Sequence, residues 1–426
     1  MARSPNRLRK LDMSVHDATV SGCPAVHSGE TDLVDPHLYS DGDAHDVWRK
    51  MRAQDGLSWH QVDEHRGFWS VVHFKEVDQV LRSTAQFTSE RGNMLSLLGM
   101  DDPAGGQQIA VTDPPRHTIM QARLKKALAV QAVDRQSEMI RGLITDLIAP
   151  IGDGGVFDWG QAMLAMPMSV TGTMMGLPPE DWPWLSRLTT ICIAVDDPEY
   201  QDEGGRSATL SMAHRELFAY FQDLVRFRRD HTGDDLISVL MNTTVEGRQM
   251  SSSEVVSNCY SLLLGANVTT PHAPSFVMAE FIDSDVLPQW AAEPEVGVTA
   301  VEEALRWASP VNHMLRYATQ DVVVRDTRIA AGDAVVTWLG AANRDETEFP
   351  DAGTFDIRRK PNKHLAFGIG PHYCVGHSVA RVTLRILFEE VLAQYQDFEP
   401  AGKPQRLVSN FVSGYKHVPI TAKRRG

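Results

Sequence analysis

The sequence is poor in cysteine, and its four cysteines stand far apart. Cys23, Cys192, Cys259 and Cys374 form no C-x-x-C pair in a chain of 426 residues. This spacing disfavours a disulfide framework, a zinc site and covalent haem attachment through a C-x-x-C-H motif. Widely spaced single cysteines are typical of a reducing compartment, so we expect a cytoplasmic protein.

Long hydrophobic runs and excess positive charge are missing too. No stretch of eighteen uncharged apolar residues occurs, and the basic arm of Arg3, Arg7, Arg9 and Lys10 is not followed by the apolar segment of a signal peptide. The 41 Lys and Arg stand against 55 Asp and Glu, which gives a net charge of −14. We therefore expect no membrane span and no binding to nucleic acid or anionic lipid.

A dinucleotide-binding fingerprint is also absent. The pattern G-x-G-x-x-G would have to lie between a strand and a helix, and no segment offers that setting. The sequence therefore predicts no flavin or nicotinamide module within this chain.

The chain does contain a strong helical pattern in a globular composition, with 42% hydrophobic and 23% charged residues. Apolar periodicity predicts helices over 43–55, 73–82, 115–130, 132–149, 160–176, 180–194, 206–231, 251–283, 298–308 and 375–395. Alternation predicts strands around 57–73, 319–338 and 405–421. We expect a mainly α fold with a minor β region, whose strands come from both ends of the sequence and pair into one small sheet. Residues 31–426 should form a single domain, and residues 1–30 a flexible arm.

Two long connections have a composition that predicts mobility. Residues 90–111 combine Gly, Pro and Asp with several apolar side chains, and residues 196–206 are acidic and rich in turn formers. Such connections are either lids over a binding pocket or solvated loops. The sequence leaves both interpretations open.

The stretch "FGIGPHYCVG", residues 367–376, is the most unusual in the chain. Its glycines and proline break regular structure, and Cys374 comes directly before a long helical pattern. A thiol at a helix N-terminus has a lowered pKa, and a thiolate is a good soft ligand for iron. A buried structural cysteine is the alternative. A catalytic nucleophile would need a base, and only His372 and His377 lie nearby in sequence.

At this point the sequence resembles the cytochrome P450 family, in its soluble bacterial form. The haem-binding signature F-G-x-G-x-H-x-C-x-G is matched at every defined position. The matching residues are Phe367, Gly368, Gly370, His372, Cys374 and Gly376. The resemblance implies a P450 fold with haem b between a long distal helix and the helix after the cysteine. It also implies that Cys374 ligates the iron, that Phe367 packs over the sulfur, and that His372 reaches a haem propionate.

Further motifs extend the resemblance over about 40–425. The family's E-x-x-R is found at Glu303 and Arg306, where two charges three residues apart can pair on one helix face. By resemblance this pair is structural, although a solvated surface pair would give the same pattern. His117 and Arg316 match further propionate-binding positions. Gln121 stands where the family usually has an arginine, and Arg123 points to another side of the helix.

The predicted distal helix departs from the family at one position. The register of the oxygen-activating motif contains Gly265, Ala266, Asn267, Val268 and Thr269. Thr269 keeps the hydroxyl that supports oxygen activation, but Val268 replaces an acidic residue that helps to relay protons. Protons must then come through water, through Asn267, or from a polar group of the substrate. The nearby Pro271 should distort the helix.

The resemblance implies O2, a small-molecule substrate, and electrons from a ferredoxin and a ferredoxin reductase. We expect the substrate pocket to be mostly apolar, lined by Met94, Leu97, Leu98, Asn312, His313, Met314 and Phe411. A basic patch for the ferredoxin is predicted from Arg123, Lys125, Lys126, Arg135, Arg381 and Arg385. Solvated helix faces would explain the same basic residues.

The expected activity is hydroxylation by a monomeric enzyme in bacterial secondary metabolism. Two alternatives stay open from the sequence. The same fold can catalyse an atypical oxidation, such as C–C, C–N or C–O bond formation, epoxidation or desaturation, and the departure at Val268 keeps this possible. A non-enzymatic haem-thiolate sensor is the other alternative, and no signalling module in the sequence supports it.

Overall fold

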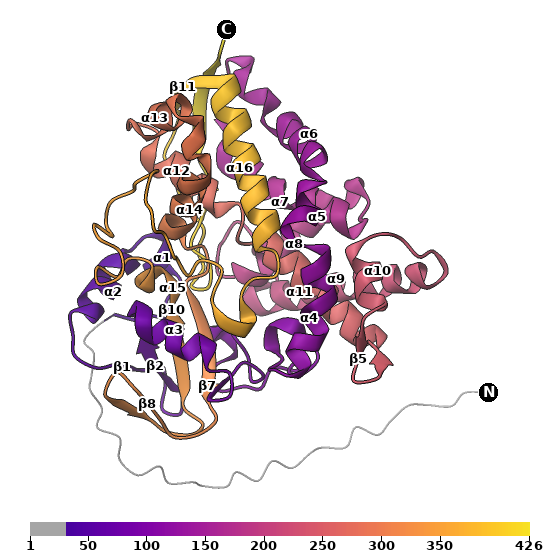
Figure 1. The fold of residues 1–426 in the computed structure, drawn as a ribbon, viewed down its shortest axis with the longest axis vertical. Coiled ribbons are helices and arrows are strands. Elements are labelled where there is room, and N and C mark those ends of the chain that lie inside the picture. The colour runs from indigo at the N-terminus through magenta and orange to yellow at the C-terminus, as the bar shows by residue number, and fades with distance from the viewer. Residues whose placement is uncertain (1–30) are drawn as a thin grey trace.

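The protein combines a large helical body with a small β region, as Figure 1 shows for the computed structural model, which describes residues 31–426. The predicted arm, residues 1–30, lies outside the described residues. The α-helices are α1 (His37–Ser40), α2 (Ala44–Arg52), α3 (Phe74–Arg82), α4 (Arg116–Ala127), α5 (Val130–Asp134), α6 (Ser137–Ile148), α7 (Trp159–Met175), α8 (Trp182–Ile193), α9 (Gly205–Asp230), α10 (Leu236–Met241), α11 (Ser252–Asn267), α12 (His272–Phe281), α13 (Val286–Ala292), α14 (Gly297–Ala308), α15 (Leu339–Ala342) and α16 (His377–Gln394).

The strands are short. They are β1 (Ser58–Gln61), β2 (Gly67–Val71), β3 (Phe87–Thr88), β4 (Phe157–Asp158), β5 (Thr244–Val245), β6 (Arg248–Gln249), β7 (His313–Ala318), β8 (Val322–Val324), β9 (Thr327–Ile329), β10 (Ala334–Trp338), β11 (Tyr395–Pro400), β12 (Gln405–Arg406), β13 (Tyr415–His417) and β14 (Pro419–Arg424). Short 3-10 turns include η1 (Leu95–Leu97), η2 (Ile109–Val111) and η6 (Gly370–His372).

The largest sheet joins the two ends of the sequence. Its strand order is β1-β2-β10-β7-β3, and β2 runs parallel to β10 with Ser70 opposite Val336. This pairing confirms that early and late strands share one sheet. The expectation that the C-terminal strands join it was wrong, because β14 pairs with β11 and β4, and β12 pairs with β13. The sequence pattern also missed β7, whose residues are buried on both faces and therefore do not alternate.

The sheet separates two of the three apolar cores. Val335 and Trp69 face the core formed with α3, whereas Val336 and Trp338 face the core that contains Trp48 of α2. Strand side chains alternate between faces, so a strand buried on both sides becomes apolar throughout. Every residue of β10 is buried accordingly. The third and largest core lies among the helices.

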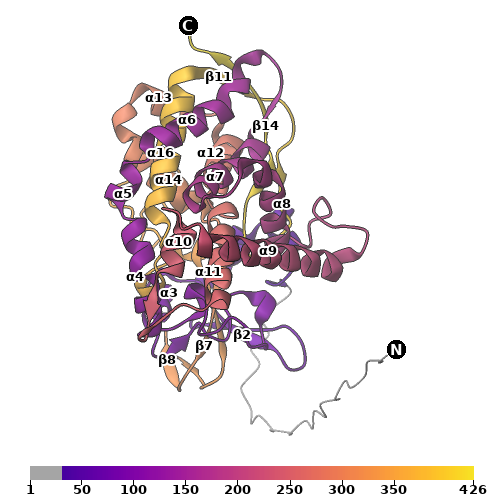
Figure 2. The ribbon, with the colours of Figure 1, turned by 90° about the vertical axis from the view of Figure 1, so that its right-hand side faces the viewer.

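The helical body is built around α16, which runs along the front of the molecule in Figure 1 and packs against α6 and α14. In Figure 2, α9 extends across the face that α8 and α11 support. The helix predicted over 251–283 is two helices, α11 and α12, separated by a break at 268–271. Pro271 causes the break, because a proline in a helix interior removes a hydrogen bond and clashes with the preceding turn.

Within residues 31–426, no helix combines the length and the hydropathy needed to cross a membrane.

Candidate functional site

The cysteine loop, residues 366–376, is held in a conformation that requires glycine. Gly368 and Gly370 have φ angles of 65° and 75°, a region that other residues rarely adopt. A Cβ on Gly370 would also lie 2.9 Å from the backbone of α3. The N–H of Cys374 donates to the carbonyl of Phe367 at 2.9 Å. The loop therefore folds back on itself and presents Cys374 just before α16.

The thiol of Cys374 is free and solvent-accessible. Desolvation by the surrounding protein raises the pKa of this thiol, while the backbone N–H groups of Gly376 and His377 and the charge of Arg381 act to lower it. The predicted effect of the helix N-terminus is therefore present but weaker than desolvation. The expectation of a lowered pKa was wrong for the sulfur in this protein environment.

Arg381 is tied into the protein behind the cysteine loop. Its guanidinium lies over the ring of Phe367, 4.5 Å from the ring centroid. The same guanidinium forms a bidentate ion pair with the carboxylate of Glu302, with N–O distances of 2.6 and 2.8 Å. It also donates to the hydroxyl of Tyr373 at 3.0 Å. Arg381 therefore joins α16 to α14 while its side chain stays 31% exposed, and its place in a basic surface patch stays a prediction.

Two histidines from distant segments meet beside the loop. The ring centroids of His117, on α4, and His372 lie 4.2 Å apart. Nδ1 of His117 contacts the side-chain nitrogen of Gln121 at 3.0 Å, and Nε2 of His372 lies 3.7 Å from a carboxylate oxygen of Asp113. Burial, and then the neighbouring His372, lower the pKa of His117 to about 3. The two rings therefore lie side by side, and each has one ring nitrogen against a neighbouring side chain.

Arg316 is a buried cation in β7. Its side chain is 3% exposed, one guanidinium nitrogen donates to the carbonyl of Leu315 at 2.8 Å, and its Nε has no partner among the described residues. Burial lowers the pKa of Arg316 to about 10, and the charge of Asp113 opposes that shift. A buried guanidinium with open donors fits an anionic group.

The break after α11 contains the second group of candidate residues. The capping box predicted for Ser251 and Glu254 starts the helix, and Gly265 near its end is exposed, with nothing within 4 Å of an added Cβ. Thr269 donates its hydroxyl to the carbonyl of Gly265 at 2.8 Å. Val268 is 3% exposed and belongs to the largest core.

Comparison with known proteins identifies this arrangement. The chain is 32% identical to cytochrome P450 NovI of Streptomyces niveus over 92% of this chain and 96% of the relative. It is 31% identical to linalool 8-monooxygenase of Pseudomonas putida over 91% of this chain and 98% of the relative.

The chain belongs to the cytochrome P450 family. The family model for cytochrome P450 matches residues 298–418. The solved structure of P450 OxyD, involved in the biosynthesis of vancomycin-type antibiotics, superposes with a TM-score of 0.82 at 32% identity, covering 93% of this chain and 100% of that one. The protein is thus a monooxygenase with the P450 fold, in a family that acts on small molecules with O2 and an iron-containing haem.

The residues of this P450 fit a haem on three independent observations. The thiol of Cys374 is accessible, as a metal ligand must be. The guanidinium of Arg316 is buried with an open donor, which suits a haem carboxylate. The open space beside Gly265 leaves room for a flat group against α11.

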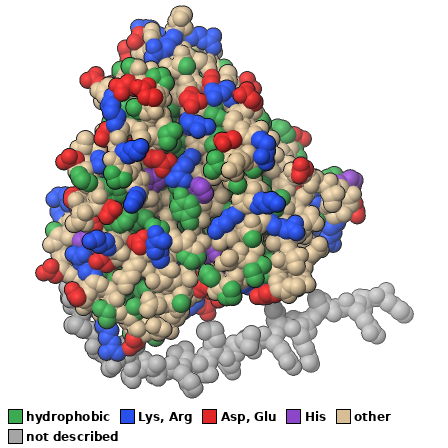
Figure 3. All heavy atoms as spheres, in the orientation of Figure 1, with side chains coloured by type: hydrophobic (Ala, Val, Ile, Leu, Met, Phe, Trp, Pro, Cys, Tyr) green, Lys and Arg blue, Asp and Glu red, His purple; other side chains and the backbone are tan. Residues whose placement is uncertain are grey.

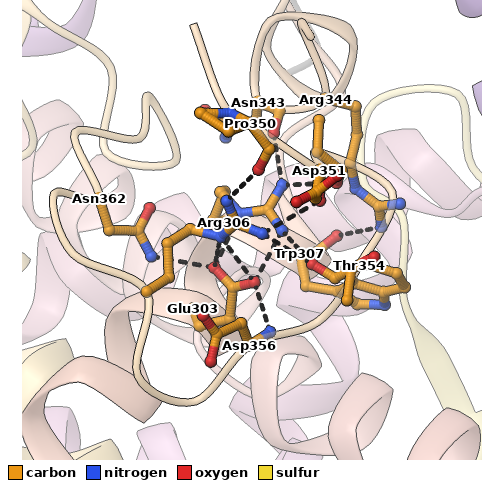
Figure 4. A network of polar contacts seen from close by, with 12 residues as sticks. Glu303, Arg306, Trp307, Asn343, Arg344, Pro350, Asp351, Thr354, Asp356 and Asn362 are labelled. Atoms are coloured by element: carbon orange, nitrogen blue, oxygen red, sulfur yellow. Dashed lines mark hydrogen bonds and ion pairs between the residues drawn. The ribbon is translucent and has the colours of Figure 1, made fainter.

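Glu303 and Arg306 form the centre of a buried polar network, shown in Figure 4. Both side chains are 0% exposed and pair at 2.7 and 2.8 Å. Arg306 also donates to the carbonyls of Asn343 at 2.8 Å and Thr354 at 3.1 Å, and Asn362 donates to Glu303 at 3.0 Å. Burial alone would raise the pKa of Glu303, but hydrogen bonds led by Arg306 hold it below its ordinary value. A solvated surface pair is excluded.

The predicted pocket residues differ in their surroundings. Met94 and Phe411 are partly buried at the edge of the largest core, Leu97 is half-buried in η1, and Met314 borders the core beside α3. Leu98 is 3% exposed inside the core that contains Trp48. Contact of these apolar residues with a substrate stays a prediction.

The two polar pocket candidates already have protein partners. Asn312 donates to the carbonyl of Asn410 at 3.0 Å and accepts from Ser413 at 2.8 Å. His313 accepts from the N–H of Leu95 at 3.0 Å. Their side chains therefore fix the segments around residues 95 and 411, and contact with a substrate stays a prediction for them as well.

Both connections predicted to be mobile are anchored. In residues 90–111, the N–H of Ile109 donates to the side chain of Asn258 on α11 at 2.8 Å. In residues 196–206, Asp197 is 0% exposed and accepts from Lys416 at 2.7 Å.

The sequence analysis did not find several residues that shape the site. Asp113 accepts from Ser89 at 2.8 Å and lies beside His372, and Asn258 connects α11 to η2. Their partners are distant in sequence, so no local pattern could have indicated them. The Asp-Pro-Pro turn before α4 was the one available signal for Asp113.

Proposed function

We propose that this P450 binds haem b through the sulfur of Cys374 and hydroxylates a mainly apolar small molecule with electrons from a ferredoxin and its reductase. The observation that supports the proposal most is the accessible thiol of Cys374 in a loop with a fixed backbone. Bound haem supplies O2 activation, and a cation bonded to the sulfur favours the thiolate over the thiol.

The chain's own residues would hold the cofactor at its two carboxylates. Arg316 contributes a buried cation, and His117 and His372 contribute ring nitrogens near each other. The side-chain nitrogen of Gln121, which stands where the family usually has an arginine, lies 3.0 Å from Nδ1 of His117. Gln121 would therefore act by orienting the ring of His117. Arg123 is exposed and takes no part in this arrangement. Phe367 would pack against the sulfur, and the guanidinium of Arg381 lies over the ring of Phe367.

On the opposite side, α11 would provide the surface over which oxygen reacts. Gly265 and Ala266 leave space, and Thr269 offers a hydroxyl at the break. Asn267 is 3% exposed and its amide nitrogen lies 3.9 Å from the sulfur of Met168. Its side chain is thus turned toward α7, which argues against a direct role for Asn267 beside Thr269.

The apolar substrate class is supported by residues at the edge of the largest core. Met94, Ile109, Leu262, Leu264 and Phe411 are partly buried there and come from three separate segments. Apolar side chains with few polar groups favour an apolar ligand. OxyD is described as involved in antibiotic biosynthesis, and this supports a place in secondary metabolism for the present chain.

The electron donor is proposed to bind near α4. Arg123, Lys125 and Lys126 are exposed on this helix, and Arg135 is exposed at the end of the next helix, α5. Figure 3 shows basic side chains gathered where Figure 1 places α4. A local basic patch on a chain with net charge −14 suits an acidic ferredoxin. We further propose that the protein is a cytoplasmic monomer.

A second candidate activity is an atypical oxidation by the same fold. The buried apolar side chain of Val268 supports it, because a residue that cannot relay protons changes how oxygen is handled. Product analysis separates the two activities, since hydroxylation adds one oxygen atom to the substrate and desaturation or C–C coupling adds none.

Purified protein, reduced and treated with carbon monoxide, tests the site. We expect the strongly red-shifted Soret absorption of a thiolate-ligated haem, its loss in Cys374→Ser, and its retention in Cys192→Ser, which changes a half-buried cysteine. An intact spectrum in Cys374→Ser would refute the proposed ligand. The protein is then combined with a ferredoxin, its reductase and NADPH and screened against apolar metabolites for oxidised products.

A further inference from the structure

Unpartnered polar atoms flank the break between α11 and α12. His272 is 1% exposed, and within the described chain neither Nδ1 nor Nε2 has a hydrogen-bond partner. The side-chain oxygen of Asn267 also lacks one among residues 31–426. Buried polar groups are almost always hydrogen-bonded, so each exception needs an explanation. Three such atoms within six residues mark the break as a place of unusual polarity.

The ring of His272 is fixed on the turn that follows Thr269. The N–H of His272 donates to the carbonyl of Thr269 at 3.2 Å. The carbonyls of Val268 and Tyr415 lie close enough to the ring to influence its titration, but neither makes a hydrogen bond of normal geometry with it.

The backbone of Gly414 packs directly against the ring of His272. A Cβ on Gly414 would lie 2.1 Å from Nδ1 of His272. No side chain other than hydrogen fits there without moving the ring. The imidazole is thus held between the break and the segment before β13 by backbone on both sides.

The ring has the chemistry of a proton relay. Burial lowers the pKa of His272 to about 4, against the opposing effect of the two carbonyls, so the ring is neutral at pH 7. A neutral imidazole has one N–H donor and one acceptor nitrogen. It can take a proton on one nitrogen while it releases one from the other. Val268, four residues earlier, has no such group.

We propose that His272 relays protons, through water in the break, to the hydroxyl of Thr269, in place of the carboxylate that Val268 lacks. Hydroxylation of a substrate RH consumes O2, two electrons and two protons and yields ROH and H2O. The electrons come from the ferredoxin and the protons from solvent. His272 ends each transfer with the number of protons it began with. It is a positioning residue, because it acts through water and Thr269. The inference rests on the proposed ferredoxin-dependent hydroxylation.

Three variants test the relay in the holoenzyme with a ferredoxin, its reductase and a substrate from the screen. His272→Leu should lower kcat about a hundredfold, at the low end of what a positioned acid–base group contributes. KM and the substrate-induced spectral shift should stay unchanged, and the solvent isotope effect on kcat should increase. His272→Asn keeps a donor and an acceptor and should recover part of the rate. Ser275→Ala removes another buried contact of α12, the 2.8 Å bond to the carbonyl of Pro271, and should leave kcat within twofold.

A second substitution separates a relay from a structural role. Val268→Asp restores a carboxylate beside the break and should return most of the lost kcat to His272→Leu. A kcat for His272→Leu within twofold of the parent, or a double variant as slow as His272→Leu, would overturn the proposal. If His272→Leu does not fold, the comparison of His272→Asn with Val268→Asp/His272→Asn decides in the same way.

A crystal structure of the holoprotein provides a readout independent of turnover. We expect an ordered water within hydrogen-bond distance of a ring nitrogen of His272 and connected to the hydroxyl of Thr269. Ring nitrogens bonded to the carbonyls of Val268 and Tyr415, with no water between His272 and Thr269, would refute the relay. The thiolate spectrum and the identity of the product do not depend on His272, so failure here is distinguishable from failure of the proposed function.

Discussion

At the scale of single residues, Arg306 is the side chain whose loss should be most costly. It neutralises Glu303 where both are 0% exposed, and a buried charge that loses its partner destabilises a protein by about 3–5 kcal/mol. We expect Arg306→Met to lower the free energy of unfolding by an amount near the lower end of that range, measured by urea titration followed by far-ultraviolet circular dichroism. Arg359, which contacts Glu303 at 3.1 Å, compensates in part.

The matched control is Arg358→Met. Arg358 pairs with Glu293 on the surface, where its side chain is 45% exposed, and an exposed ion pair contributes about 0–1 kcal/mol. Equal shifts in the two variants would contradict the importance of burial.

Residues located by a motif were predicted well, and residues defined by long-range partners were not. The E-x-x-R spacing located Glu303 and Arg306, and a charge pair on one helix turn is visible in sequence. The ion pair of Arg381 was not predicted, because its partner Glu302 lies on another helix. The burial of His272 was not predicted either. A single histidine after a proline does not indicate in the sequence which residues will surround its ring.

At the scale of elements, the connection between α8 and α9 is held by a cluster of charges. His417 lies between Asp158 at 2.6 Å and Glu199 at 3.1 Å, and Lys416 contacts Asp197 and Glu199 at 2.7 and 3.1 Å. Desolvation lowers the pKa of His417, but the hydrogen bonds that the ring makes to its two carboxylate partners outweigh it and raise the pKa overall. The connection is therefore held in part by His417, whose raised pKa favours the charged imidazolium.

The sign of this shift predicts a pH dependence. A raised pKa stabilises the folded contacts below the ordinary histidine pKa of about 6.5, and this stabilisation is lost as pH rises through the raised value. Neutral His417 can donate to one carboxylate instead of two. We expect amide exchange in residues 196–206, corrected for the intrinsic rate, to accelerate between pH 6 and pH 9.

His417→Gln is the control for this prediction. It should remove the pH dependence, because glutamine does not titrate, whereas Lys416→Met should accelerate exchange at both pH values. A pH dependence of equal size in His417→Gln would show that another group controls the connection.

The long helices were predictable, whereas the fully buried strand β7, the short helices α10 and α13, and the partners of each element were not. Ten helical patterns were found because amphipathic periodicity is local. The helix over 251–283 was predicted with a distortion and proved to be two helices. The residues that hold 90–111 and 196–206 come from α11 and from strands near the C-terminus, so the composition of those loops alone predicted mobility.

At the scale of the whole molecule, charge distribution should govern electron delivery. Lys125 is exposed on α4, so Lys125→Glu should slow reduction by ferredoxin on the order of threefold to tenfold at low ionic strength, because steering depends on complementary charge. The difference should shrink above about 0.2 M salt as charges are screened. Stopped-flow measurement of the first electron transfer tests this.

Arg226→Glu is the matched charge reversal. Arg226 lies on a different helix, α9, with its side chain 73% exposed. It should leave the rate unchanged, and a rate for Lys125→Glu equal to the parent rate at low salt would reject the docking site.

The parallel pairing of β2 with β10 has a consequence for folding of the chain during its synthesis on the ribosome. The second strand is made long before its neighbour, because Ser70 and Val336 pair across 336 − 70 = 266 residues of chain. Contacts between such remote segments form late, since the intervening chain must first be available to close the loop. Until then, the edge of β2 that β10 will cover stays without its permanent neighbour. Synthesis of this chain therefore passes through a nascent intermediate in which the β1–β2 hairpin lacks β10 until the intervening helices have been made.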